Sequence, residues 1–240
     1  IDIVEGINYQ NVAKTALHTS AECDMYQQVD PTKKTGTWDR SSGVYDRFTG
    51  LPDHETSVPA QNCWDASPFQ WYNQGCVAVE TNNATIGVPF NENEGGVYAL
   101  EWDPEAGYIR SWVFAPHKVV PENLREAMDS AGDADSEVLP DTSTWGLPYG
   151  YFAIGDESRC SSDHFQNMRI VFNLAFCGTV AGNRYFIDCP KQAELFTKAG
   201  GWDPVGSCNE WIKSEPEELD EAYWKIRGVY VYEREMKFST

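Results

Sequence analysis

The sequence predicts an all-β fold in which antiparallel sheets pack as a sandwich. Short segments alternate between apolar and polar residues, and turn-forming residues separate them. The clearest case is a hairpin, in which strands at 97–102 and 108–114 flank a turn at 103–107. Aromatic residues make up 13% of the 240 residues and supply large side chains for a sandwich core. No internal repeat or linker divides the chain.

The charge of the chain excludes several kinds of partner. Asp and Glu number 37 against 18 Lys and Arg, which gives a net charge of −19. A field of this sign repels nucleic acids and anionic membranes, so we expect neither as a partner. The longest apolar segment, 170–176, has the length of a strand and is too short to span a bilayer. An acidic secreted protein kept in solution by its charge accounts for the composition equally well.

Seven cysteines are widely spaced along the chain. None forms a Cys-x-x-Cys pair, so we expect no zinc site. Their spacing is typical of disulfides in an oxidising compartment, which predicts a secreted, extracellular or cell-wall protein. An odd number means that one thiol is free or pairs outside these residues. A Cys63–Cys76 bridge would staple a loop, although spacing alone does not determine the pairing.

The first six residues predict a strand with two carboxylates on one face. Ile1 and Ile3 alternate with Asp2, which sends the isoleucines to one side and the carboxylate to the other. Strict alternation would bury Glu5 with the isoleucines, and an unpaired buried carboxylate is costly. A β-bulge at residues 3–4 would bring Glu5 round to the face of Asp2. Two solvated carboxylates on an exposed strand remain the alternative interpretation.

Further elements follow along the chain. Residues 14–20 predict a second strand, with His18 facing opposite to Leu17. A helix of three turns at most is expected at 121–134, and a shorter one at 217–222. Strands are predicted at 168–176 and 223–232, with a loop at 188–207. Trp102 and Trp112 are expected to pack in the core, and the alternative is that they form platforms for sugar rings.

Three segments together carry a family resemblance. Residues 1–8 resemble the active-site strand of glycoside hydrolase family 16, whose motif is Glu-x-Asp-x-x-Glu. Residues 163–178 and 223–232 resemble signatures of the fungal-type endo-1,3(4)-β-glucanase branch, which contains laminarinases and mixed-linkage glucanases. The resemblance covers most of residues 1–232. The part of the family's sequence that stands upstream of the catalytic motif is not among these residues.

The resemblance implies a particular version of the sandwich. It predicts a jelly roll of two antiparallel sheets, similar to concanavalin A, with one short helical insertion. Residues 1–232 would form the second part of a single glucanase-like domain, and residues 233–240 a C-terminal tail. An upstream segment or chain is then expected to complete the sandwich.

The resemblance also assigns roles at the site. Glu5 would be the general acid/base and Asp2 the assisting residue, while His18 and Asn8 would bind the substrate. The nucleophile would be a glutamate directly before Ile1. We expect no cofactor, and no metal either, because Arg227 stands where many members carry a calcium-binding Asp.

The implied activity is that of a retaining endo-β-glucanase. It would cleave β-1,3 or mixed β-1,3-1,4 glucan, as polysaccharide or oligosaccharide, by double displacement. A neutral glucan is compatible with the acidic charge of the chain. The alternative is a catalytically inactive β-glucan-binding or recognition protein. For His18, the alternative is an ordinary histidine on a half-buried strand.

Overall fold

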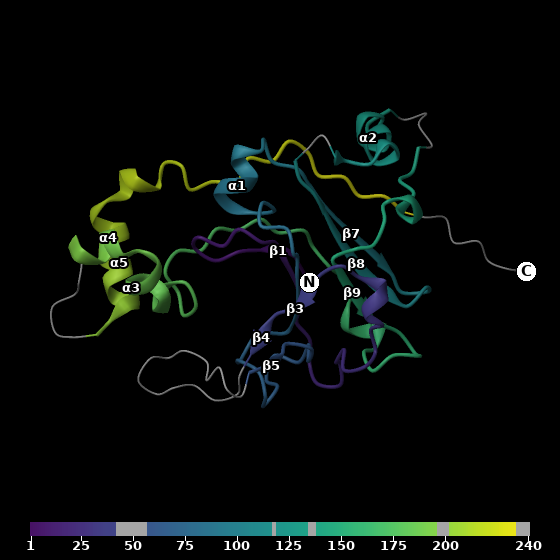
Figure 1. Ribbon diagram of the computed structural model, residues 1–240, viewed down its shortest axis with the longest axis horizontal. Helices are drawn as coiled ribbons and strands as arrows, with labels where there is room; N and C mark the ends of the chain where they lie inside the picture. The colour runs from purple at the N-terminus through teal and green to yellow at the C-terminus, as the bar shows by residue number, and fades with distance from the viewer. Residues whose placement is uncertain (42–56, 117–118, 134–137, 196–201, 234–240) are drawn as a thin grey trace, which may run out of the picture. The chain divides into compact units, whose positions relative to one another are not determined.

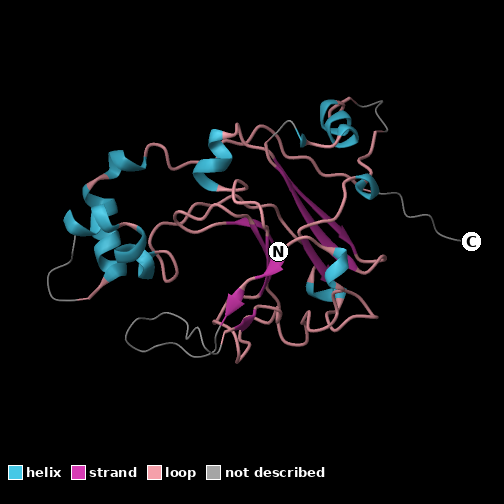
Figure 2. Cartoon of the chain, in the orientation of Figure 1, coloured by secondary structure: helices cyan, strands magenta, loops and turns pink. Residues whose placement is uncertain are grey.

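A computed structural model describes residues 1–41, 57–116, 119–133, 138–195 and 202–233, and its strands form three antiparallel sheets (Figures 1 and 2). A four-stranded sheet has the order β1-β2-β6-β3, a two-stranded sheet pairs β4 with β5, and a three-stranded sheet has the order β7-β8-β9. The strands are β1 (Asp2–Glu5), β2 (Lys14–Leu17), β3 (Thr37–Trp38), β4 (Arg40–Ser41), β5 (Val58–Pro59), β6 (Cys76–Val79), β7 (Val97–Asp103), β8 (Tyr108–Phe114) and β9 (Gly150–Ala153).

Helices are short and lie between or after these strands. The α-helices are α1 (Gly87–Glu92), α2 (Glu122–Asp129), α3 (Tyr185–Asp188), α4 (Pro190–Leu195) and α5 (Pro204–Ser214). The 3-10 helices are η1 (Pro31–Lys33), η3 (Thr142–Thr144), η4 (Ser162–His164), η5 (Gly182–Arg184) and η6 (Pro216–Leu219). No helix in the described part of the chain is both long and apolar enough to cross a lipid bilayer.

The predicted hairpin is confirmed in the three-stranded sheet. Strand β7 pairs with β8 from Val97↔Phe114 to Asp103↔Tyr108, and β9 then pairs with the other edge of β8. The turn closes at Gly107, whose φ of +78° lies in the left-handed region that favours glycine. Along β8, Ile109 and Val113 pack in one core cluster, while Trp112 and Phe114 pack in another on the opposite face of the strand.

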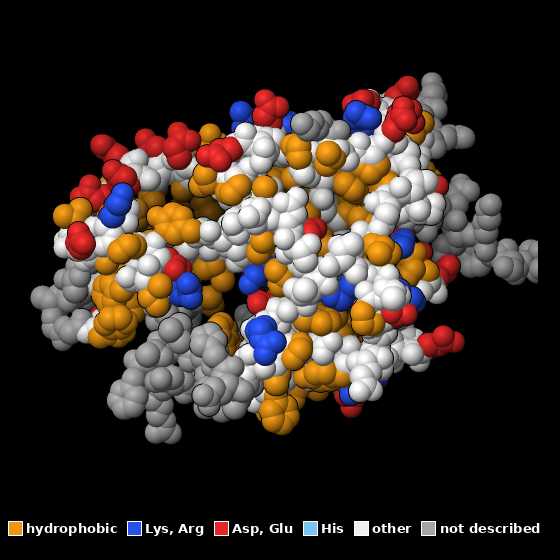
Figure 3. Space-filling view, in the orientation of Figure 1, with side chains coloured by type: hydrophobic (Ala, Val, Ile, Leu, Met, Phe, Trp, Pro, Cys, Tyr) orange, Lys and Arg blue, Asp and Glu red, His pale blue; other side chains and the backbone are white. Residues whose placement is uncertain are grey.

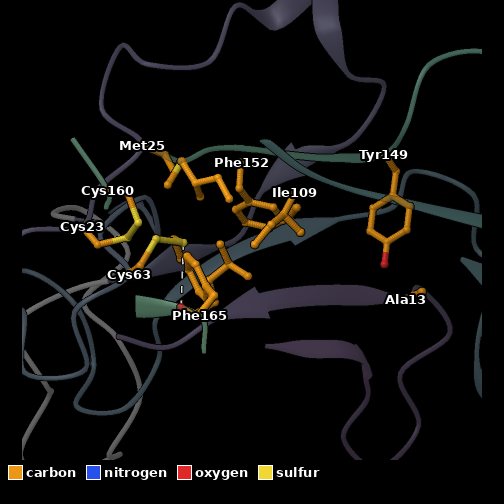
Figure 4. Packing of buried hydrophobic residues seen from close by; sticks show 13 residues of the cluster. Ala13, Cys23, Met25, Cys63, Ile109, Tyr149, Phe152, Cys160 and Phe165 are labelled. Atoms are coloured by element: carbon orange, nitrogen blue, oxygen red, sulfur yellow. Dashed lines mark hydrogen bonds between the residues drawn. A yellow bond between two sulfur atoms is a disulfide. The ribbon is translucent and has the colours of Figure 1, made fainter. Parts of the chain in front are cut away.

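The four-stranded and three-stranded sheets bury one core between them. Leu17 and Ala78 reach it from the first sheet, and Ile109 and Phe152 reach it from the second (Figure 4). All four side chains are fully buried. Two β-sheets that share one apolar layer are the arrangement that the sequence predicts for a sandwich.

Two disulfides border this core. Cys23 pairs with Cys160, and Cys63 pairs with Cys76, as Figure 4 shows. The second pair confirms the bridge that the spacing made possible. Cys189 carries the free thiol, in agreement with the odd number of cysteines.

The chain separates into two compact units. The first contains residues 1–6, 11–166 and 228–240, and the second contains residues 7–10 and 167–227. Within the second unit, the Cys177–Cys208 disulfide and the buried Tyr185 anchor helices α3, α4 and α5. The single domain expected for residues 1–232 remains a prediction.

The expectation of one short helical insertion is wrong. Helix α2 lies where an insertion was predicted, but α1, α3, α4 and α5 are additional. Helix α5 has a clear local cause: the side chain of Asp203 accepts a hydrogen bond from Gly206 N, and Pro204 occupies the first turn. This start signal lies within residues 188–207, whose composition predicts a loop.

The strands predicted at 168–176 and 223–232 are also wrong. Both segments are described, and neither belongs to a strand. Alternating apolar residues predict a strand only where another strand supplies hydrogen bonds and a core receives the apolar face. Among the described residues, no strand pairs with either segment. Hydrophobic side chains are exposed at several places on the face of the molecule that Figure 3 draws.

The two tryptophans of the hairpin differ. Trp112 is 4% exposed and packs in a core cluster with Val120 and Leu124, as predicted. Trp102 is 40% exposed, so its prediction as a core residue is wrong. It lies one residue before the end of β7, a strand in which no residue is fully buried.

Candidate active site

The opening strand carries the predicted bulge. Asp2 pairs with Ala16, and Glu5 pairs with Lys14, so β1 advances three residues while β2 advances two. The extra residue breaks the strict alternation of side chains. Val4 therefore packs toward the core, and Glu5 joins Asp2 on the opposite face.

A buried hydrogen-bond chain holds the bulge from beneath. The Thr15 hydroxyl donates to the carbonyl of Ile3 at 2.9 Å, and it accepts from the Tyr149 hydroxyl at 2.5 Å. Both side chains are buried, where an unsatisfied polar group would be costly. Burial raises the pKa of Tyr149, so the phenol stays neutral and remains a donor. The network fixes the backbone at the point where the strand turns its carboxylates outward.

His18 connects two carboxylates. Its Nε2 lies 2.9 Å from Asp2 Oδ2, and its Nδ1 lies 2.8 Å from Asp65 Oδ1. The hydrogen bond to Asp2 raises the pKa of His18, and Asp65 adds to this effect against the opposing cost of burial. In turn, the hydrogen bond from His18 lowers the pKa of Asp2. The site therefore favours an imidazolium beside an ionised Asp2.

Glu5 has the opposite tendency. Burial raises the pKa of Glu5, and the negative charge of Asp2 raises it further. The charges of His18 and Lys14 lower the pKa in part, while Asp39, which forms an ion pair with Lys14 at 2.7 Å, raises it slightly. Glu5 consequently keeps its proton to a higher pH than an ordinary glutamate, while Asp2 loses its proton at a lower pH than an ordinary aspartate.

The cluster of Asp2, Glu5 and His18 does not require a metal ion to account for its geometry. Donor atoms of Asp2, Glu5 and His18 all lie within 4.8 Å of one another, a spacing that could also suit a cation. Both ring nitrogens of His18 already face carboxylates, however, and burial raises the pKa of Glu5. This arrangement fits proton transfer better than metal ligation.

The structure brings together three of the four predicted site residues. Asp2, Glu5 and His18 share one face of the four-stranded sheet in the first unit. Asn8 belongs to the second unit, where its Nδ2 donates to Asp188 Oδ2 at 2.7 Å and to the carbonyl of Ala181 at 3.4 Å. Its role in substrate binding remains a prediction.

Asp65 is the residue that the sequence did not reveal. It lies inside the loop that the Cys63–Cys76 disulfide closes, 47 positions from His18, with no motif around it. Its backbone N–H donates to the carbonyl of Thr19, which places it beside the end of β2. Long-range backbone pairing creates this contact, so residue spacing carries no signal of it.

Comparisons with known proteins identify the family of this chain. The family described as "XgeA-like, catalytic GH16 domain" matches residues 1–232. An endo-1,3(4)-beta-glucanase of Arthroderma benhamiae is 32% identical over 238 residues, which cover 98% of this chain and 41% of that protein. A probable endo-1,3(4)-beta-glucanase of Aspergillus fumigatus is 30% identical, over 97% of this chain and 28% of that protein. The chain thus spans less than half the length of these curated relatives.

A solved structure is similar as well. It is titled as an elongating GH family 16 beta-1,3-glucosyltransferase, with 28% identity and a TM-score of 0.60 over 92% of this chain and 58% of that one. The match to the family model begins at residue 1 and so includes the strand with the two carboxylates. The chain belongs to glycoside hydrolase family 16, among its XgeA-like catalytic domains.

Proposed function

We propose that this chain carries the acid/base part of a retaining endo-β-glucanase site. The observation that supports this most strongly is the pair of carboxyl groups whose environments push their pKa values apart. A protonated Glu5 beside an ionised Asp2 provides a proton donor and a fixed negative charge on one strand face. Cleavage of a glycosidic bond with retention requires such a proton donor together with a nucleophilic carboxylate.

The proposed first step forms a covalent glycosyl-enzyme. A glutamate directly before Ile1 attacks the anomeric carbon, the glycosidic C–O bond breaks, and Glu5 gives its proton to the leaving oxygen. A residue at that position would share the face of Asp2, because it stands two residues away on a strand. The negative charge of Asp2 would influence the pKa values of both glutamates.

The second step returns the site to its starting state. The Glu5 carboxylate takes a proton from water, the resulting hydroxide oxygen bonds to the anomeric carbon, and the bond to the nucleophile breaks. Glu5 is protonated again, and the sugar keeps its β configuration. His18 holds Asp2 through both steps by a charge-assisted hydrogen bond.

The substrate that we propose is β-1,3 or mixed β-1,3-1,4 glucan outside the cell. The names of the fungal relatives support this substrate class. Three disulfides support an oxidising compartment, and therefore a secreted or cell-wall location.

We also propose that further strands complete a jelly-roll sandwich around these residues. Support comes from 168–176, a segment without helix or strand whose apolar side chains are exposed. They are Met168, Ile170, Val171, Phe172, Leu174 and Phe176, each at least 44% exposed. An exposed group of apolar side chains of this kind is suited to be covered by another part of the protein.

The stereochemistry of the product tests the proposed function. We expect the full-length protein to release reducing ends from laminarin or barley glucan, with the β anomer appearing first in a proton NMR time course. Double displacement predicts retention because two inversions occur at the same carbon. Early appearance of the α anomer would contradict the mechanism, and binding of glucan with no release of reducing ends would support the inactive alternative.

A further inference from the structure

We propose that Asp65 is a positioning residue of this site, one that acts through His18. Its carboxylate holds the far side of the imidazole so that the near side donates to Asp2. The inference rests on the proposed glucanase function, and it assigns Asp65 to the network that sets the charge of the site.

The geometry brackets the imidazole between two carboxylates. Asp65 Oδ1 lies 2.8 Å from Nδ1, and Asp2 Oδ2 lies 2.9 Å from Nε2. The side chain of His18 is 23% exposed, while those of Asp2 and Asp65 are 47% and 35% exposed. Both nitrogens can donate at once only when the ring is an imidazolium. Two carboxylates therefore favour the charged ring, whereas a single one would also accept a hydrogen bond from a neutral ring.

Asp65 is itself held firmly by backbone contacts. Its N–H donates to the carbonyl of Thr19 at 3.2 Å, and its carbonyl accepts from Asn73 N at 2.7 Å. The loop then returns past the ring, since a side chain added at Gly75 would lie 3.0 Å from Nδ1 of His18. The carboxylate is thus supplied by a braced loop beside the site, which is what a positioning role requires.

The charges around His18 determine what loss of Asp65 would do. Asp2 and Glu5 face the ring from β1, Asp65 faces it from the disulfide loop, and the Lys14–Asp39 ion pair lies near Glu5. Removal of the Asp65 charge weakens the preference for the imidazolium. His18 would then lose its proton at a lower pH, and Asp2 would face a neutral ring over part of the working range.

An Asp65→Asn variant of the full-length protein tests this role. We expect the titration midpoint of His18, followed by NMR of labelled histidine rings, to fall by about one pH unit, a tenfold change in proton affinity. A drop of about tenfold in kcat is expected at pH values where His18 is neutral in the variant but charged in the unmodified protein. KM should stay nearly unchanged, because the proposed role of Asp65 is exerted through His18 and not on the substrate.

The matched control is Asp156→Asn, which removes one exposed carboxylate from the same unit. It should leave both the His18 titration and the rate profile unchanged. If Asp65→Asn does not fold, Asp65→Ser carries the same expectation. An unchanged His18 midpoint in either folded variant overturns the inference. Absence of glucan turnover by the unmodified protein would instead remove the proposed function, and the NMR titration would still decide the role of Asp65.

Discussion

Glu5→Gln in the full-length protein lowers turnover of unactivated β-glucan by about 10²–10⁴-fold, the usual contribution of general acid–base catalysis. Glutamine has nearly the same shape as glutamate, so the bulge and its supporting network stay in place. It cannot supply a proton to the leaving oxygen, however. Steady-state release of reducing ends from laminarin measures the loss.

An activated aryl glucoside separates the acid role from a structural one. Its leaving group departs without protonation, so the variant should still release one equivalent of phenol in a rapid burst. Glu157→Gln is the matched control, because Glu157 is an exposed glutamate in the turn after β9. The control should retain the activity of the unmodified protein, whereas near-normal glucan turnover by Glu5→Gln would remove Glu5 from the role.

Removal of the Cys23–Cys160 disulfide should produce the largest loss of stability. Its cysteines are separated by 137 residues, and the chain-entropy relation gives about 5 kcal/mol for a loop of that length. Both cysteines are buried within the core cluster, and the disulfide links the segment that follows β2 to this core. Urea unfolding of the full-length Cys23→Ala, Cys160→Ala double variant, followed by tryptophan fluorescence, measures the change.

The Cys63→Ala, Cys76→Ala pair is the matched control for this comparison. These cysteines are equally buried, but their separation is only 13, which corresponds to about 3 kcal/mol. The two double variants lose the same atoms, so their difference isolates the length of the closed loop. Equal losses of unfolding free energy in both variants would contradict the loop-length explanation.

Features that depend on near neighbours could be predicted from the sequence. The bulge followed from the cost of burying Glu5 among isoleucines, and it is present between Asp2 and Glu5. The hairpin followed from alternation around a turn, and its full register is present. The position of His18 beside the carboxylates followed from the resemblance and from the strand that adjoins the motif.

Features that depend on distant partners could not be predicted. Asp65 reaches His18 because backbone pairing near Thr19 brings a disulfide loop alongside β2. The segment 168–176 has the pattern of a strand, but a strand forms only where another strand pairs with it. Helix α5 lies between these cases. Its start signal, Asp203-Pro204, is local, but it stands in a segment whose composition predicts a loop.

The most direct measurement is a pH titration of the Glu5 carboxyl group by carbon NMR in the full-length protein. Its resonance can be assigned by its absence in Glu5→Gln. The account predicts that Glu5 titrates above the ordinary glutamate value, because burial and the charge of Asp2 disfavour its ionised form. Asp2 should titrate below the ordinary aspartate value. A Glu5 carboxyl that loses its proton at or below the ordinary glutamate value would contradict the account.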